Sequence, residues 1–568
     1  MKKNRKFLVV FIINLVIFIT INLLFNIKYE QVDDFIIYSL YSGLDGTFNL
    51  HAIYIHPVIC IIIGLLFRIL SFINWHSIYL LSMQFVCFTL IGYTFLKKHN
   101  SNTSIVLYAL FASVFYTTFM MLVQYTSVAA LLIFTAFFLL INSLEMREDK
   151  KRKQIITEYS TIFILYTLGI MTRIQSLLIV LPFFIFYFIM YLFKFIKNSN
   201  DKQEFLKLLK CYLIIGAITI IIYLSNFFIY NSNPVYKKYN EWNKARTMIQ
   251  DMMKISYTED NEIYEKVGWT KNDLFLFNTF GFGDENIFSK DSIIIINDLK
   301  GNKDGNSWVN KNFPIIIYKT FTSLYKSYTF IFIIFMAMYV LNLLKNNKRI
   351  ENTLIFLLTI FINMIFIALN RSMLRVVIPE YLIGTALLIY NLNIKNKKTS
   401  ENELLIYLIA FFSALFICYN SGAMYQLGYK LNNYTQYKEL INFTNNNKDN
   451  VYLYTIPSLQ HRYLAYSVYT MPPKGSFSNL RQMGGWDMYT ENYYDFKDRN
   501  GLDGTFLDLL KDNVYLIDGE VIWSGTKYDD YKGKIAVAIK EHYNIDVEFV
   551  EVEQFNNLKI YKTVLVEE

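Results

Sequence analysis

Two adjacent carboxylates stand out early in the chain. Asp33 and Asp34 lie in YEQVDDFIIYSLYSGLDG, a few residues after a long apolar run. Carboxylates beside an apolar segment are costly to desolvate, so they need a proton, a cation or a cationic partner. One of them could act as a general base that takes the proton from a hydroxyl. Alternatively, the pair only caps the helix that follows, and the spacing leaves both interpretations open.

Three arginines beside apolar runs have the chemistry to hold an anion. Arg173 lies in GIMTRIQSLL, and Arg371 and Arg375 lie in NRSMLRVVIPE. A guanidinium in an apolar setting needs an anionic partner, and its planar donors match a phosphate bidentately. We therefore expect a phosphate or diphosphate ligand at these residues. The alternative is that they reach ordinary phospholipid headgroups.

A third set of polar and aromatic residues occupies the middle of the chain, in KKYNEWNKAR (237–246), GWTKND (268–273) and GDEN (283–286). These residues could bind a substrate. Alternatively, the tyrosine and arginine of the first stretch dock this segment on the rest of the protein, and the tryptophan packs at an interface. The Asn-Asp pair could cap a helix. We expect Asp284 and Glu285 to be solvated. The candidate binding residues are Tyr239, Asn240, Arg246, Trp269, Asn272 and Asp273, with His56 earlier in the chain.

The elements that must position these residues are membrane spans. Hydrophobic residues make up 54% of the 568 residues, and many apolar runs reach the roughly 20 residues that a bilayer core demands. Lys and Arg lie in short clusters between those runs, where they orient helices, so the net charge of +9 does not indicate a nucleic-acid partner. The four cysteines lie in apolar segments at no metal-ligand spacing, which argues against disulfide or zinc roles: Cys60, Cys87, Cys211 and Cys418.

Hydropathy predicts eleven spans, near 7–27, 77–96, 103–121, 124–143, 154–171, 175–195, 210–230, 326–344, 352–369, 376–392 and 404–423. The first run is too long for a signal peptide and no small-residue cleavage site follows it, so we expect an uncleaved span. With the N-terminal MKKNRK inside, every strongly basic short loop falls on the cytoplasmic side, as the positive-inside rule requires. Three long segments then lie outside, namely 28–76, 231–325 and 424–568.

One apolar run is predicted not to span. His56 to Ile73 contains Arg68 and a short apolar stretch, and counting it as a span would invert every later basic loop. We expect an interfacial helix with Pro57 in its first turn.

The tail has a different character. Short β-rich runs at Val451–Ile456 and Asn513–Ile517 alternate with polar and helical stretches. Asp546–Phe555 and Leu558–Val564 flank Asn556-Asn557 and predict an antiparallel hairpin. The expected organisation is a transmembrane domain over 1–423, with outer loops 28–76 and 231–325, and an extracytoplasmic α/β domain over 424–568.

The acidic pair after the first span, followed by His56-Pro57 opening an apolar helix, resembles the GT-C fold of membrane glycosyltransferases that use polyprenyl-phosphate sugars. Protein mannosyltransferases carry an acidic pair and an HPP motif in comparable places. Here Val58 replaces the second proline and the Gly-Lys that follows is missing. The identity of the acceptor therefore cannot be inferred from protein mannosyltransferases. The motifs in 237–246, 268–273 and 283–286, together with Gly484-Gly485-Trp486-Asp487 in the tail, resemble motifs of a group of large Gram-positive membrane proteins. That group is assigned to the same fold class.

The resemblance implies an inverting glycosyltransferase of the cell envelope, with a polyprenyl-phosphate sugar donor and a glycan, lipid or protein acceptor. Asp33 or Asp34 would be the base, and Arg371, Arg375 and Arg173 would hold the donor phosphate. Some enzymes of this fold use Mg or Mn and others use no metal, and no third ligand is identifiable here. The alternatives are a transporter or flippase of lipid-linked glycans, a glycan polymerase or ligase, and a non-catalytic scaffold.

Overall fold

The computed structural model describes residues 3–99, 101–146, 151–197, 202–253, 256–304, 312–322, 329–345, 348–392, 435–459, 462–519, 521–523, 526–528 and 531–566. The predicted span 404–423, Cys418 and the predicted boundary at 423/424 lie outside these ranges.

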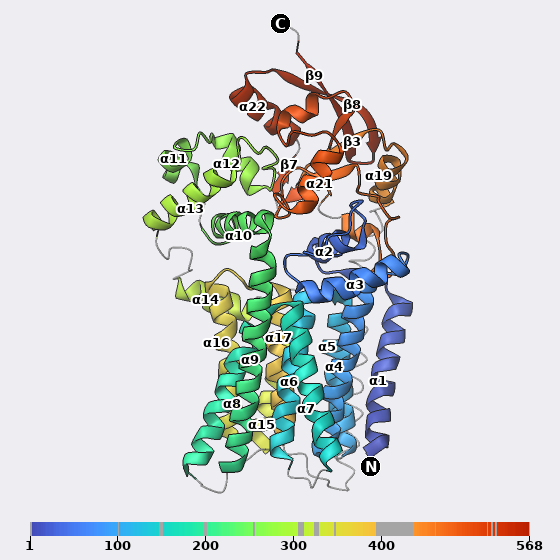
Figure 1. The fold of residues 1–568 in the computed structure, drawn as a ribbon. Coiled ribbons are helices and arrows are strands. Elements are labelled where there is room, and N and C mark those ends of the chain that lie inside the picture. Colours follow the sequence, from blue (N-terminus) through green and yellow to red (C-terminus); the bar gives the residue numbers. More distant parts are fainter. Residues whose placement is uncertain are drawn as a thin grey trace.

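A bundle of long apolar helices forms the lower body of the molecule (Figure 1). Within the described residues, nine helices are long and apolar enough to cross a membrane, and each coincides with a predicted span. The run predicted over 326–344 forms α15 (Thr329–Lys345), which at 17 residues is somewhat shorter. The nine lie in α1 (Lys3–Leu24), α4 (Trp75–His99), α5 (Asn102–Met121), α6 (Tyr125–Glu145), α7 (Arg152–Thr172), α8 (Leu177–Lys197), α9 (Lys202–Ser232), α16 (Arg349–Ala368) and α17 (Leu374–Asn391).

Burial within the bundle separates central helices from peripheral ones. The apolar windows of α6 and α17 are 89% and 83% buried, whereas those of α1 and α9 are 17% and 28% buried. A helix that is apolar all round and buried only on one side needs an apolar surrounding for its other face. The bundle is therefore that of a multi-pass membrane protein.

Two short helices lie across the end of the bundle that carries the acidic pair (Figure 1). They are α2 (Val32–Ser42) and α3 (Pro57–Ile69). At 13 residues α3 is about 20 Å long, too short for a bilayer core of about 30 Å. It buries one face and exposes apolar side chains such as Ile62 and Leu65 on the other. The length of α3 and its position across the end of the bundle agree with the expected interfacial helix.

Beyond that end α9 continues past the bundle into a second body, which we call the headpiece (the described parts of residues 233–304 and 435–566) (Figure 1). At 31 residues, about 46 Å, α9 is longer than a bilayer is thick. The first headpiece segment contains α10 (Pro234–Thr247), the π-helical turn η3 (Met248–Met252), α11 (Tyr257–Glu265), α12 (Lys271–Asn278) and α13 (Lys290–Asp304).

The second headpiece segment is α/β. Its five-stranded sheet has the order β4-β3-β5-β9-β8, in which β4, β3 and β5 are parallel and β9 and β8 are antiparallel additions. The predicted hairpin is confirmed as β8 and β9, with Asn556 in a left-handed turn conformation. The strands are β3 (Val451–Tyr454), β4 (Leu480–Gln482), β5 (Val514–Gly519), β8 (Val547–Phe555) and β9 (Leu558–Leu565), and the helices include α19 (Thr435–Asn446), α21 (Glu491–Arg499) and α22 (Tyr531–Tyr543).

Both faces of the sheet are buried along its inner strand β3, against different partners. Along β3, Tyr452 and Tyr454 belong to the core that runs down into the bundle. Val451 and Leu453 belong to a second core shared with α10, α12 and α22. This alternation is the two-residue period of a strand, and it explains why β3 is apolar throughout. The first headpiece segment (233–304, from here on the middle segment) and the second (435–566, the tail) therefore pack as one body.

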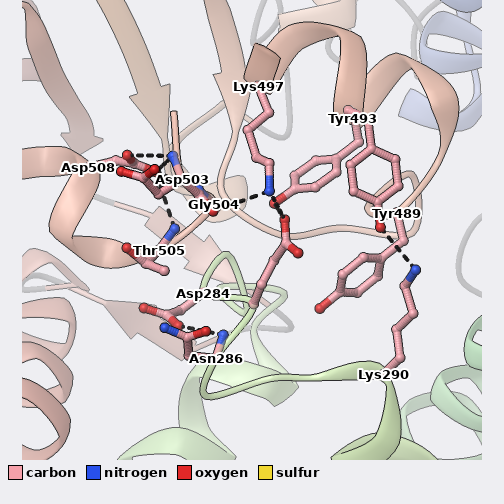
Figure 2. A network of polar contacts seen from close by, with 12 residues as sticks. Asp284, Asn286, Lys290, Tyr489, Tyr493, Lys497, Asp503, Gly504, Thr505 and Asp508 are labelled. Atoms are coloured by element: carbon pink, nitrogen blue, oxygen red, sulfur yellow. Dashed lines mark hydrogen bonds and ion pairs between the residues drawn. The ribbon is translucent and has the colours of Figure 1, made fainter. Parts of the chain in front are cut away.

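A polar network ties these two headpiece segments together (Figure 2). Asp284 accepts hydrogen bonds from the backbone of Phe506 at 2.8 Å and from the hydroxyl of Tyr543 at 2.9 Å. Glu285 pairs with Lys497 at 2.8 Å. The expectation that Asp284 is solvated is wrong, because its side chain is fully buried and several donors replace the lost water. Burial raises the pKa of Asp284, which those donors oppose.

Candidate active site

The acidic pair stands at the start of α2, where the chain leaves a short parallel pairing of β1 (Lys28–Tyr29) with β2 (Leu122–Val123). Carboxylates in the first helical turn suit the positive end of the helix dipole. The helix ends at Gly43, whose φ of +80° favours glycine. Because β1 fixes the chain against the α5–α6 turn, the two carboxylates are held at one end of the bundle.

Asp34 points into the protein and is fully buried. Its carboxylate accepts hydrogen bonds from His76 Nε2 at 3.1 Å and from the backbone N–H of Tyr125 at 3.1 Å. The other ring nitrogen of His76 is hydrogen-bonded to the hydroxyl of Tyr41. Burial raises the pKa of Asp34, and the bond from His76 opposes that rise. These contacts give Asp34 the surroundings of a residue that fixes the position of α2.

Asp33 points the other way and is 23% exposed at its side chain. Its carboxylate lies 3.5 Å from Arg375, which also contacts the side-chain oxygen of Gln31. A third carboxylate, Glu30, faces the same guanidinium across a cavity of about 10 Å³. Burial raises the pKa of Glu30 to about 7, and the charge of Arg375 opposes that rise.

Arg173 reaches the same place from the turn after α7. It contacts the hydroxyl of Tyr125, and its guanidinium lies 4.9 Å from the Tyr125 ring centre and 5.4 Å from that of Tyr54. Burial raises the pKa of Tyr54, and the charges of Arg246, Asp33 and Arg173 all act on this hydroxyl. Tyr54 is thus within electrostatic range of one carboxylate and two arginines.

Arg246 in α10 approaches from the headpiece. It is only 3% exposed, and its donors are used by Asn243, Thr247 and Gln250. All three partners are neutral, so within the described chain no carboxylate pairs with this buried cation. A buried charge without a counter-charge favours the approach of an anion.

Arg371 has a partner of its own. Its guanidinium lies 3.3 Å from Asp251, in the π-helical turn η3 that follows α10. Arg371 stands after α16, where Asn370 adopts a left-handed conformation and turns the chain toward α17. The structure therefore brings Arg375 and Arg173 together around Tyr125 and ties Arg371 to the headpiece.

His56 occupies a helix start. Its Nδ1 accepts from the backbone of Val58 at 3.3 Å, and its Nε2 is hydrogen-bonded to Ser225 of α9 at 3.0 Å. Burial lowers the pKa of His56. With both ring nitrogens engaged, this histidine joins α3 to α9.

The remaining predicted residues divide between the site and the headpiece interior. Tyr239 is fully buried and donates to the backbone oxygen of Trp486, whose ring meets Tyr54 at 5.1 Å. Asn240 is exposed on α10. The Gly-Gly-Trp-Asp stretch thus covers the candidate site on its headpiece side.

Trp269, Asn272 and Asp273 lie elsewhere, in α12 or just before it. Trp269 is 1% exposed and donates to the backbone of Ile287. Asn272 donates to the backbone of Lys534, and Asp273 completes a capping box at the start of α12. Figure 1 places α12 well apart from α2. Asn272 therefore joins the middle segment to the tail, whereas the contact of Trp269 and the capping box lie within the middle segment.

A group of three possible metal ligands among the described residues also lies between α12 and α22. Asp273, Glu541 and His542 offer ligand atoms within 4.8 Å of one another. His542 already hydrogen-bonds Asp273 at 2.8 Å, which accounts for the cluster without an ion. In the described part of the site, Arg375 stands between Glu30 and Asp33, and Asp34 is engaged by His76, so these carboxylates do not form a comparable group.

Sequence reasoning missed several residues of this site. Glu30, Gln31, Tyr54, His76 and Tyr125 carry no motif, and all but the first two are distant from the acidic pair in sequence. Glu30 could have been predicted from the sequence, because it is a further carboxylate only three residues before Asp33. The rest meet only when the helices pack.

Fold and site together define a multi-pass helical membrane protein with a charged, aromatic-lined site between its bundle and an α/β headpiece. No protein-family model matches the chain, and no curated protein sequence matches it. Among solved structures, the chain is similar to ArnT from Cupriavidus metallidurans in the apo state, with 96% of this chain and 97% of that chain covered. The identity is 9% and the TM-score 0.40, so this likeness decides neither the fold nor the function.

Proposed function

We propose that the chain is a membrane glycosyltransferase that moves a sugar from a polyprenyl-phosphate donor to an acceptor hydroxyl. The reaction would take place at the outer face of the cytoplasmic membrane, in synthesis or modification of cell-envelope glycans. The observation that carries this proposal is a partly exposed carboxylate, Asp33, beside Arg375 and close to Arg173 at the end of an apolar bundle. A lipid-linked phosphate would reach such a site from the bilayer edge.

The arginines would bind the donor phosphate. Arg375 contacts Asp33 only at 3.5 Å, and Arg173 has a hydroxyl and two rings as its partners. A phosphate offers both guanidinium groups a stronger, charge-assisted partner. As the bond between the anomeric carbon and the phosphate oxygen breaks, negative charge grows on that oxygen, and fixed cations there lower the barrier. Arg371 would hold η3 in place through Asp251.

Asp33 would act as the base. Once a phosphate occupies Arg375, the Asp33 carboxylate is free to accept the proton of an acceptor hydroxyl, whose oxygen forms the new bond to the anomeric carbon. Polyprenyl phosphate leaves with the bonding electrons and the product is inverted, by analogy with the fold class that the motifs resemble. Trp486 and Tyr54 would form an apolar wall for the sugar.

A second candidate, transport of lipid-linked glycans, is favoured by one observation. Glu380 is fully buried within α17, next to Pro379 inside the same helix. Buried ionisable residues and prolines within spans are features of transporters. A transporter does not need a base at Asp33, so substitution there separates the two functions.

The test replaces Asp33 and Asp34 separately by asparagine and compares the cell-envelope glycans with those of wild-type and deletion strains. We expect Asp33→Asn to reproduce the deletion profile in a normally inserted protein, since loss of a general base slows a reaction about 10²–10⁴-fold. Asp34→Asn is the matched control: it should lower the melting midpoint while the folded protein still produces the glycan. Wild-type glycans in Asp33→Asn cells, with altered glycans in the deletion strain, would contradict the transferase function and favour transport.

A further inference from the structure

A second polar cavity lies between α2 and the tail part of the headpiece. It has a volume of about 30 Å³, and its lining includes Ser39 of α2, Asp45, Tyr454, Arg462, Phe477 and Arg481. We call it the Arg462 cavity. By the usual measure, this space holds about two water molecules, enough for a pair of hydroxyl groups. Asp45 is partly exposed, so the cavity adjoins the surface there.

Arg462 is the unusual member of this lining. Its side chain is 5% exposed, and among the described residues one hydrogen bond, to the backbone oxygen of Leu459 at 3.2 Å, engages one of its five N–H donors. Its other contacts are the faces of Phe35 and Tyr454, with ring centres 5.7 Å and 5.1 Å away. A buried guanidinium with free donors is costly. A ligand that accepts hydrogen bonds would remove that cost.

Asp45 supplies the complementary group. No hydrogen bond or ion pair to another described residue engages its carboxylate, although the charges of Arg481 and Arg462 act on it. Burial is the largest influence and raises the pKa of Asp45 to about 6. The cavity therefore offers free donors from Arg462 and free acceptor positions from Asp45.

The charges around the cavity favour a neutral ligand. Arg481 is paired with Asp487 at 2.8 Å, and Gln482 contacts the other oxygen of that carboxylate. This pair is complete, which leaves Arg462 and Asp45 as the remaining charged residues of the lining, and Arg499, outside the lining, also acts on Asp45. An anionic ligand would be repelled by Asp45, and a cationic ligand would be repelled by Arg462. Two adjacent hydroxyl groups of a neutral ligand can donate hydrogen bonds to Asp45 and accept hydrogen bonds from Arg462.

The cavity also adjoins the candidate active site. Ile36 of α2 lines it and lies one helical turn, about 4.5 Å along the axis, from Asp33. On the headpiece side Asp487 lines it, and the preceding residue, Trp486, packs against Tyr54. A molecule held here would be anchored next to the place where an acceptor hydroxyl must meet Asp33.

We propose that the Arg462 cavity is a binding subsite for a neutral sugar of the acceptor, held through adjacent hydroxyl groups between Arg462 and Asp45. Its role as an acceptor subsite rests on the proposed glycosyltransferase function. The binding itself is independent of catalysis, because Asp33 does not line the cavity.

The experiment uses the full chain in lipid nanodiscs and saturation-transfer NMR with methyl glycosides of glucose, galactose, mannose and N-acetylglucosamine. We expect the wild type to bind at least one glycoside, and both Asp45→Asn and Arg462→Gln to weaken that binding tenfold or more. Lys540→Gln, on the exposed end of α22, is the matched control and should bind like the wild type. Asp45 is partly exposed, so Asp45→Asn is informative even if the Arg462 variant fails to fold.

Three results would overturn the inference: no glycoside binds, a glycoside binds Asp45→Asn as tightly as the wild type, or inorganic phosphate competes for the subsite. Asp33→Asn separates the two proposals, since it should keep sugar binding. If that variant makes normal envelope glycans while Asp45→Asn abolishes sugar binding, the transferase function fails and the sugar site stands.

Discussion

Neighbouring residues in this chain have opposite surroundings. Asp33 and Asp34 are adjacent, yet one carboxylate faces Arg375 at the partly open site and the other is fully buried against His76. A helix turns by about 100° per residue, so consecutive side chains cannot share a face. The assignment of the base to Asp33 rests on this difference.

At the scale of single residues, Glu30 is expected to make the stability of the folded protein depend on pH. Burial raises its pKa from 4.5 to about 7, so the folded protein favours the protonated form. The stability from that proton is complete below about pH 4.5 and is lost as the pH rises through about 7. Glu30→Gln should therefore gain in melting midpoint over the wild type between pH 5.5 and pH 8.5. The linked free energy is at most about 3 kcal/mol.

The control for this comparison is Glu262→Gln, at an exposed glutamate on α11. Its melting midpoint should differ from the wild type by the same amount at both pH values. A Glu30→Gln advantage that is constant or shrinks with rising pH would contradict the assignment.

At the element scale, the Gly-Gly-Trp-Asp stretch connects the sheet to the middle segment. Gly484 and Gly485 both have a φ of +97°, which favours glycine. A Cβ on Gly484 would approach the backbone oxygen of Phe280 more closely than real Cβ atoms do. This close contact places Trp486 over Tyr54, so a short loop positions one wall of the site.

Gly484→Ala should lower the melting midpoint and expose the middle segment to trypsin at Lys266 and Lys271. Gly475→Ala is the matched control, because its φ is +74° but no atom lies within 4 Å of the added Cβ. Backbone strain of about 1 kcal/mol is common to both variants. The clash should make Gly484→Ala worse by a further 1–3 kcal/mol or so. Equal effects in the two variants would show that the approach to Phe280 is unimportant.

At the scale of the whole molecule, the basic clusters gather at the end of the bundle opposite the headpiece. Figure 1 shows the ends of α7, α8 and α9 that meet there, and they carry Arg152, Lys197 and Lys202. Lys98 and Lys348 both pair with Glu145 at the same end. The positive-inside rule predicts that this end faces the cytoplasm and that the headpiece lies outside.

Single cysteines test this orientation. Cysteine in place of Lys540, on the headpiece, should react with a membrane-impermeant maleimide in intact cells. Cysteine in place of Lys202, at the other end, should react only after the cells are permeabilised. The described native cysteines are buried and should contribute little label. The reverse pattern would place the site on the cytoplasmic side and contradict an outer-leaflet donor.

The sequence by itself determined the elements and their composition. In the described part of the chain, nine of the eleven predicted spans, the short helix α3 and the β8–β9 hairpin follow from local hydropathy, length and turn residues, which act over one element at a time. It also singled out Asp33, Asp34, Arg173 and Arg375.

Only the tertiary structure decided how these residues meet. Asp33 and Arg375 are more than 300 residues apart, and Arg173 joins them through Tyr125 and Tyr54. The packing of the middle segment on the tail sheet placed Trp269, Asn272 and Asp273 away from the site and buried Asp284. The Arg462 cavity likewise combines α2 with strands more than 400 residues later. Such contacts depend on which faces of distant elements pack together, and a local pattern carries no information about that choice.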